Sequence, residues 1–239
     1  MLELRNISYE VEENKEIIKD VSFTIDDHFV AITGPNGGGK STLAKIIAGI
    51  VTPTGGQIFL DGEDITNLSI TERAQKGISF AFQQPVHFKG LTVKDLITIA
   101  SGKQMSVTEI CAVLSEVGLC AREYIDREIN NSLSGGELKR IEIAMIKARG
   151  TKLSIFDEPE AGIDLWSFNS LIKVFEKMRD AINGTILIIS HQERILNIAD
   201  KVIVIADGKL EKVGSKEEVL PGLLHTSSAC STLVEKSER

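Results

Sequence analysis

A glycine-rich run that follows a short apolar stretch, residues 28–33, carries the clearest chemical signal in the chain. It fits the pattern G-x-x-x-x-G-K-[ST] and consists of Gly34, Pro35, Asn36, Gly37, Gly38, Gly39, Lys40, Ser41 and Thr42. Such glycines let successive backbone N–H groups turn inward around a phosphate, and the N-terminus of a following helix adds its dipole. Lys40 then reaches the β- and γ-phosphates and the Ser41 hydroxyl binds Mg²⁺. The run predicts a site for a nucleotide with Mg²⁺. The alternative is a chance glycine-rich turn, which is disfavoured because the run lies between a predicted strand and a predicted helix.

Two adjacent acids, Asp157 and Glu158, end a buried apolar run that reads as a strand. Ligands bind at the carboxyl ends of strands in doubly wound sheets, so Asp157 is expected to hold the water shell of Mg²⁺. Glu158 is then the natural group to polarise an attacking water. The alternative is a pair of solvated acids at a strand end, which the phosphate loop makes the weaker interpretation.

A second glycine pair, Gly135 and Gly136, opens a predicted helix within the run Leu-Ser-Gly-Gly-Glu, residues 133–137. Apolar residues follow at steps of three and four, and they are Leu138, Ile141, Met145 and Ala148. One stripe of this helix therefore packs inward, and its N-terminus at Ser134 is free for an anion. By itself this pair is weak evidence, because many helices begin at glycines.

These candidate residues need a parallel sheet to bring them together. Strand-like runs at 152–159, 184–191 and 201–210 are separated by a helical stretch at 165–181, which is the alternation of an α/β fold. Residues 2–11 also read as a strand, and the change of apolar parity between Leu4 and Ile7 predicts a bulge. The helical pattern around residues 93–130 predicts an inserted lobe. We expect one domain at 1–220, with this lobe at roughly 84–140, and a disordered tail at 221–239.

The overall composition excludes several classes of protein. A net charge of −7 opposes a broad surface for nucleic acid. The chain begins with no secretory leader and has no run of roughly 18 apolar residues, so we expect a cytoplasmic protein that does not insert into a membrane. The three cysteines, Cys111, Cys120 and Cys230, lack the close spacing of metal ligands. We expect them to be ordinary thiols.

Over residues 1–215 the chain resembles the ABC ATPase family, whose LSGGQ signature is present here as LSGGE, with 23 positions from Ser134 to Asp157. The resemblance implies a nucleotide-binding domain with a mixed, mainly parallel phosphate-loop core, an antiparallel β part and the inserted helical lobe. It also assigns roles to Gln83 (Q-loop, Mg²⁺ and water), His191 (switch histidine, γ-phosphate), residues 161–164 (D-loop) and Tyr9 (stacking on adenine). The cofactors implied are ATP and Mg²⁺.

The same resemblance implies a pair of subunits in a head-to-tail arrangement. Ser134, Gly135 and Gly136 of one subunit would cover the ATP held by the phosphate loop of the other, and Lys40, Gln83, Glu158 and His191 would carry catalysis.

Within the family, the segments SFAFQQP, LSGGELKRIE and HQERIL resemble SufC, the ATPase of SUF iron–sulfur cluster assembly. This implies a SufB-like scaffold as partner. A membrane permease is the first alternative, and a non-hydrolysing, ATP-gated clamp is the second. Whichever partner exists, the segment around the Q-loop is the expected docking surface, and its apolar residues are Phe82, Pro85, Val86, Phe88 and Leu91.

Overall fold

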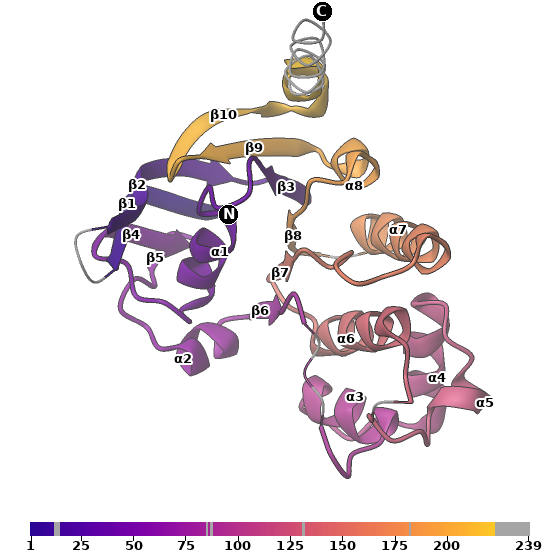
Figure 1. Cartoon of the computed structure of the whole chain (residues 1–239). Helices are drawn as coiled ribbons and strands as arrows, with labels where there is room; N and C mark the ends of the chain where they lie inside the picture. The colour runs from indigo at the N-terminus through magenta and orange to yellow at the C-terminus, as the bar shows by residue number, and fades with distance from the viewer. Residues whose placement is uncertain (12–14, 85, 87, 131, 182, 223–239) are drawn as a thin grey trace, which may run out of the picture.

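A six-stranded, mostly parallel sheet forms the centre of the computed structural model, which describes residues 1–11, 15–84, 86, 88–130, 132–181 and 183–222 (Figure 1). Its strands, in spatial order, are β10 (Lys209–Ser215), β9 (Lys201–Ala206), β3 (Phe29–Thr33), β8 (Thr185–Ile189), β7 (Leu153–Asp157) and β6 (Ile78–Ala81). Only β10 runs antiparallel to its neighbour. The carboxyl ends of β3, β8, β7 and β6 therefore lie at one edge of the sheet, as the sequence predicts for its site.

Both faces of this sheet are buried. All five residues of β3 are buried, and their side chains alternate between two apolar cores. Phe29 and Ala31 belong to the core shared with the helical lobe, whereas Val30 and Ile32 belong to the core shared with the antiparallel sheet. A continuous apolar strand of this kind is what a parallel sheet covered on both sides requires.

A four-stranded antiparallel sheet covers one side of the molecule. It contains, in spatial order, β2 (Lys15–Ile25), β1 (Leu2–Val11), β4 (Gly55–Leu60) and β5 (Glu63–Asp64). The β1–β2 register shifts between Leu4 and Ile7, where Asn6 has a positive φ of 51°, so the predicted bulge is confirmed.

The helices divide between the core and the lobe. Those of the core are α1 (Lys40–Ala48), α2 (Ile70–Gln75), α7 (Leu165–Ala181) and α8 (Glu193–Ile198), and those of the lobe are α3 (Val93–Ser101), α4 (Val107–Glu116), α5 (Ala121–Tyr124) and α6 (Gly135–Arg149). Serine or threonine caps with an acid three residues later begin α2, α3, α4 and α6. The α6 helix is continuous across the expected lobe limit at 140, so the lobe and the core share it (Figure 1).

Residues 216–222 are helical, so Pro221 and Gly222 continue the ordered chain, while the predicted tail from 223 to 239 lies outside the described residues. Cys111 and Cys120 are free thiols, and Cys230 also lies outside the described residues. In the part of the chain that the structure describes, no helix combines the length and the apolar character that a bilayer span needs.

Candidate active site

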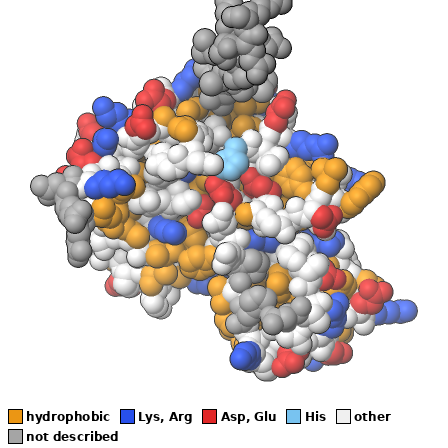
Figure 2. Space-filling view, viewed as in Figure 1, with side chains coloured by type: hydrophobic (Ala, Val, Ile, Leu, Met, Phe, Trp, Pro, Cys, Tyr) orange, Lys and Arg blue, Asp and Glu red, His pale blue; other side chains and the backbone are white. Residues whose placement is uncertain are grey.

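Four neighbouring strands deliver the predicted catalytic residues to one edge of the sheet. Strand β3 leads into the phosphate loop, β7 ends at Asp157 and is followed by Glu158, and β8 is followed by His191. Strand β6 leads to Gln83. Figure 2 shows acidic side chains and a histidine gathered near the middle of this face. The structure thus brings together residues up to 157 positions apart in the sequence, Gly34 to His191.

The phosphate loop has the backbone that the glycine pattern predicts. Gly34 and Gly39 have φ values of 134° and 98°, in the region that favours glycine. A Cβ at Gly34 would lie 2.0 Å from the Ile205 carbonyl oxygen, so no side chain fits there. A Cβ at Gly38 would lie 3.0 Å from the carbonyl oxygens of Ile205 and Pro35, so the loop packs closely on β9 at this position.

Lys40 spans the loop from the first turn of α1. Its Nζ donates to the carbonyl oxygens of Gly34 and Pro35, each at 2.9 Å. Burial lowers the pKa of the Lys40 ammonium, and the nearby carboxylates of Glu158 and Asp157 act in the opposite direction. An ammonium held at a glycine-rich loop that leads into a helix N-terminus fits the binding of a nucleotide phosphate.

Ser41 and Asp157 fit a magnesium site. The Ser41 hydroxyl donates to Asp157 Oδ1 at 2.8 Å, and Asp157 is only 4% exposed. Burial raises the pKa of Asp157, which the Ser41 hydrogen bond opposes. A hydroxyl and a carboxylate are hard oxygen ligands of the kind that Mg²⁺ takes alongside nucleotide phosphates. Their roles as ligands stay a prediction, but the two side chains are already together.

Glu158 lies between Gln83 and His191. Gln83 Nε2 donates to Glu158 Oε2 at 2.7 Å, and His191 Nε2 lies 3.6 Å from Glu158 Oε1. Glu158 has a φ of 44°, which is unusual for a residue with a side chain and costs on the order of 1–3 kcal/mol. The surrounding structure therefore imposes an unfavourable backbone on the residue that the sequence assigns to the attacking water.

The signature residues pack against the D-loop and the start of α7. Ser134 caps α6, and its backbone N–H donates to Glu137 Oε2 at 2.6 Å. A Cβ at Gly136 would lie 2.8 Å from the Ser167 Cβ, so a glycine is needed for this approach. The structure places Ser134, Gly135 and Gly136 on the lobe, on a different helix from the phosphate loop (Figure 1). Their role toward an ATP held by a second subunit stays a prediction.

The structure adds residues that the sequence did not single out. Ser190 is fully buried and donates to Glu160, whose carboxyl pKa is raised by burial. Glu160 is the third acid in the run that starts at Asp157, and this run is the sequence feature that could have pointed to it.

Tyr9 lies in β1, opposite Ile18, partly buried against the core. Its stacking on adenine stays a prediction.

The comparisons with known proteins agree with this geometry. A family model described as "ABC transporter" matches residues 18–161. The chain belongs to this ABC ATPase family. Its members bind ATP with Mg²⁺, and the chain is an Mg²⁺-dependent ATPase with the ABC nucleotide-binding fold.

Several relatives and solved structures are similar to this ABC ATPase over most of its length. An uncharacterized ABC transporter ATP-binding protein of Methanocaldococcus jannaschii, MJ0035, is 40% identical over 215 residues, which cover 86% of each chain. The energy-coupling factor transporter ATP-binding protein EcfA1 of Ureaplasma parvum is 31% identical, with 91% of this chain and 75% of that protein covered. The cassette MJ0796, described as a post-hydrolysis dimer bound to ADP and Pi, gives a TM-score of 0.79 at 26% identity, covering 90% of this chain and 99% of the other. The names of MJ0035 and EcfA1 concern transport, and none of the three gives support to the SufC resemblance.

Proposed function

We propose that this ABC ATPase works as a head-to-tail pair of subunits that closes on two molecules of Mg-ATP and drives a membrane permease. The observation that carries the proposal is the division of the site. The phosphate loop, Asp157, Glu158, Gln83 and His191 meet at one sheet edge, whereas Ser134 opens a helix of the lobe. In the proposed pair, a second subunit places its own signature helix against that edge. The solved structure of MJ0796, which is a dimer bound to ADP and Pi, supports this arrangement.

In the proposed mechanism, Lys40 and the loop N–H groups hold the β- and γ-phosphates, and Ser41 and Asp157 hold the metal. Mg²⁺ bound there neutralises charge on the transferred phosphoryl group. Glu158 orients and polarises the attacking water, while Gln83 and His191 fix the position of its carboxylate. Ser134 of the second subunit donates to the γ-phosphate and so excludes water from the closed site. Hydrolysis removes that contact, and opening of the pair is the mechanical output.

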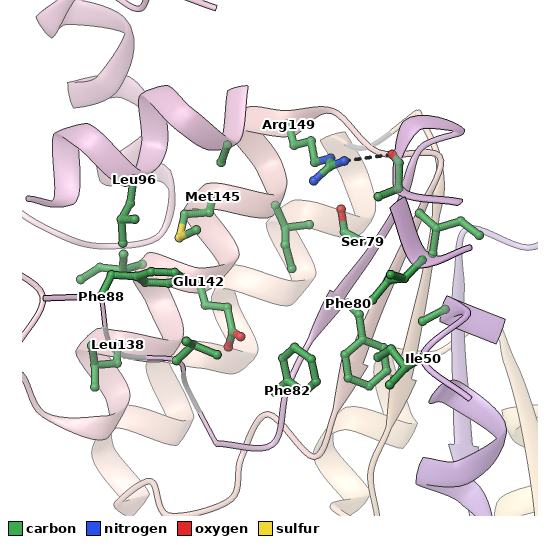
Figure 3. Close-up of a pocket in the computed structure, with 18 of the residues that line it drawn as sticks. Ile50, Ser79, Phe80, Phe82, Phe88, Leu96, Leu138, Glu142, Met145 and Arg149 are labelled. Carbon is green, nitrogen blue, oxygen red and sulfur yellow. Dashed lines mark hydrogen bonds between the residues drawn. The ribbon is translucent and has the colours of Figure 1, made fainter. Parts of the chain in front are cut away.

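A groove beside the Q-loop is the proposed docking surface for the partner. It has a volume of ≈ 290 Å³ and lies between β6 and α2 on one side and the lobe helices α3 and α6 on the other (Figure 3). Phe82, Val86 and Phe88 line it and are 39%, 50% and 36% exposed. Leu91 is partly buried against the lobe core, so we exclude it from the docking surface, and Pro85 lies outside the described residues.

The identity of the partner rests on the relatives. EcfA1 is named for a transporter, and MJ0035 is named as an ATP-binding protein of one. We therefore place this ATPase at the cytoplasmic face of a membrane, beside a permease. Family membership and the grouping of Glu158 with His191 favour hydrolysis over the non-hydrolysing clamp.

A soluble SufB-like scaffold is the second candidate partner. The residues that resemble SufC in the signature region all make specific contacts here. Glu137 forms the capping box with Ser134, and Lys139 and Glu142 form an ion pair at 3.1 Å. These contacts are compatible with either partner, and the SUF candidate rests on the sequence resemblance alone.

Capture of the tagged chain from its native cells in mild detergent, with mass spectrometry, separates the two partners. Val86→Asp places a charge in the groove, and Val213→Asp, a 38% exposed valine on β10, is the matched control. We expect a permease with the wild type and with Val213→Asp, and its loss with Val86→Asp. Recovery of a soluble scaffold instead would support the SUF candidate. Capture of neither class by any of the three chains would contradict a motor role.

A further inference from the structure

A buried cation of helix α6 lies next to the Q-loop. Lys139 is only 2% exposed, which is rare for a lysine without fixed partners. Its Nζ donates to the backbone carbonyl oxygen of Phe82 and to Glu142 Oε2, the latter at 3.1 Å. The ammonium of Lys139 therefore bonds one loop carbonyl and one carboxylate.

Glu142 completes the arrangement from the next turn of the same helix. Its carboxylate forms an ion pair with Lys139 at 3.1 Å. Burial raises the pKa of Glu142, and the charge and the hydrogen bond of Lys139 lower it. Residues three apart lie on one face of a helix, so the two side chains reach the same point. Figure 3 shows Glu142 and Phe82 on facing sides of the groove.

Phe82 is thus held through its backbone carbonyl oxygen. This oxygen accepts a hydrogen bond from Lys139, and Glu142 in turn holds Lys139. The next residue in the chain is Gln83, whose Nε2 donates to Glu158 Oε2 at 2.7 Å. A displacement of the Phe82 backbone would move the Gln83 backbone with it, because the two share a peptide bond. The contacts therefore run from α6, through Phe82 and Gln83, to the carboxylate that faces the attacking water.

We propose that Lys139 and Glu142 are positioning residues for hydrolysis. Together they clamp Phe82 to the signature helix and so hold Gln83 against Glu158. The signature helix and the catalytic carboxylate of one subunit are then linked through two consecutive loop residues, Phe82 and Gln83, and a shift of the lobe moves Gln83. The inference rests on the ATPase activity and not on the identity of the partner.

A purely structural role is the competing explanation, since removal of one member of a buried ion pair destabilises a protein. The chain offers a second ion pair away from the site, with side chains that are 38% and 25% exposed, as a comparison. Arg179 Nη2 donates to Asp200 Oδ1 at 2.5 Å, and Asp200 Oδ2 accepts from the Phe29 amide at 2.9 Å. This pair likewise bonds a backbone group, here an amide through the carboxylate, but neither of these hydrogen bonds involves a catalytic residue.

The test measures kcat and KM for ATP together with unfolding in urea. Lys139→Met removes the donor to Phe82 and should lower kcat roughly 10- to 100-fold, as expected for a displaced reacting group. KM should stay within about twofold, because no contact to the phosphates is lost. Lys139→Arg keeps a buried donor and should recover most of kcat. Arg179→Met should lower the stability and leave kcat unchanged.

The decisive arm combines Lys139→Met with Gln83→Ala. If the clamp acts through Gln83, the double variant should hydrolyse ATP at the rate of Gln83→Ala alone. Multiplicative losses in the double variant, or a wild-type kcat in Lys139→Met, would overturn the proposal. Where Lys139→Met does not fold, Glu142→Gln takes its place in the same cycle. It removes the charge and keeps a side-chain oxygen that can accept from Lys139. We therefore expect a smaller loss of kcat that again disappears in the Gln83→Ala background, and additivity there would equally refute the clamp.

Discussion

Substitution of Glu158 by glutamine isolates the chemical role of its carboxylate. The two side chains have nearly the same size, and a glutamine oxygen can still accept the hydrogen bond that Gln83 Nε2 now makes at 2.7 Å. The φ of 44° at this position is a property of the surrounding backbone, so the strain stays in the variant. We therefore expect little change in the free energy of unfolding and an intact phosphate loop.

Loss of a general base costs roughly 10²- to 10⁴-fold in rate. This corresponds to about 2.7–5.4 kcal/mol in the activation free energy at 1.36 kcal/mol for each factor of ten. Glu158→Gln should bind Mg-ATP like the wild type, release phosphate more slowly by that factor and accumulate as an ATP-bound dimer in size-exclusion chromatography. Glu193→Gln, an exposed acid near His191, is the control and should keep wild-type turnover. Wild-type phosphate release by Glu158→Gln would refute the assignment of the water to this carboxylate.

Two further predictions concern the core and the subunit contact. Arg73 is 1% exposed and donates to four backbone carbonyls, including those of Ile46 and Ile47 at the end of α1. Arg73→Met removes these four hydrogen bonds and should therefore lower the free energy of unfolding in urea by roughly 3 kcal/mol or more. An unchanged urea midpoint would contradict that. Trp166 is the single tryptophan, is 81% exposed and follows the D-loop, so Mg-ATP added to Glu158→Gln should shift its emission to shorter wavelength. A constant spectrum in a sample that is dimeric by chromatography would place Trp166 outside the interface.

The sequence predicts the sheet edge well because strand ends and glycine positions are local signals. The phosphate loop needs glycine at Gly34 and Gly39 for backbone reasons that act within a few residues. The bulge near Asn6 follows from the change in the alternation of apolar residues between Leu4 and Ile7, which is visible in the amino-acid sequence. Ser41 and Asp157 meet because both follow parallel strands of one sheet, which the alternation of strands and helices already implies.

Contacts between distant segments could not be predicted in the same way. Lys139 stands at a helix position where a lysine would ordinarily be solvated, and only the approach of the Q-loop buries it. Leu91 and Phe82 are both apolar residues near the Q-loop, yet one packs on the lobe core and the other lines the groove. The choice between a permease and a SUF scaffold could not be predicted from local motifs either, because it depends on the surface that the partner protein binds.

Mixing two inactive chains tests the shared active site most directly. Lys40→Ala removes the cation of the phosphate loop, and Ser134→Arg blocks the cap of the signature helix, where the backbone N–H of Ser134 already bonds Glu137. Each homodimer then lacks two working sites, whereas a mixed dimer retains one intact phosphate loop facing one intact signature. We predict that phosphate release, absent in either chain alone, returns on mixing in proportion to the mixed dimer. No phosphate release from a mixture in which the mixed dimer has been demonstrated would contradict the head-to-tail pair.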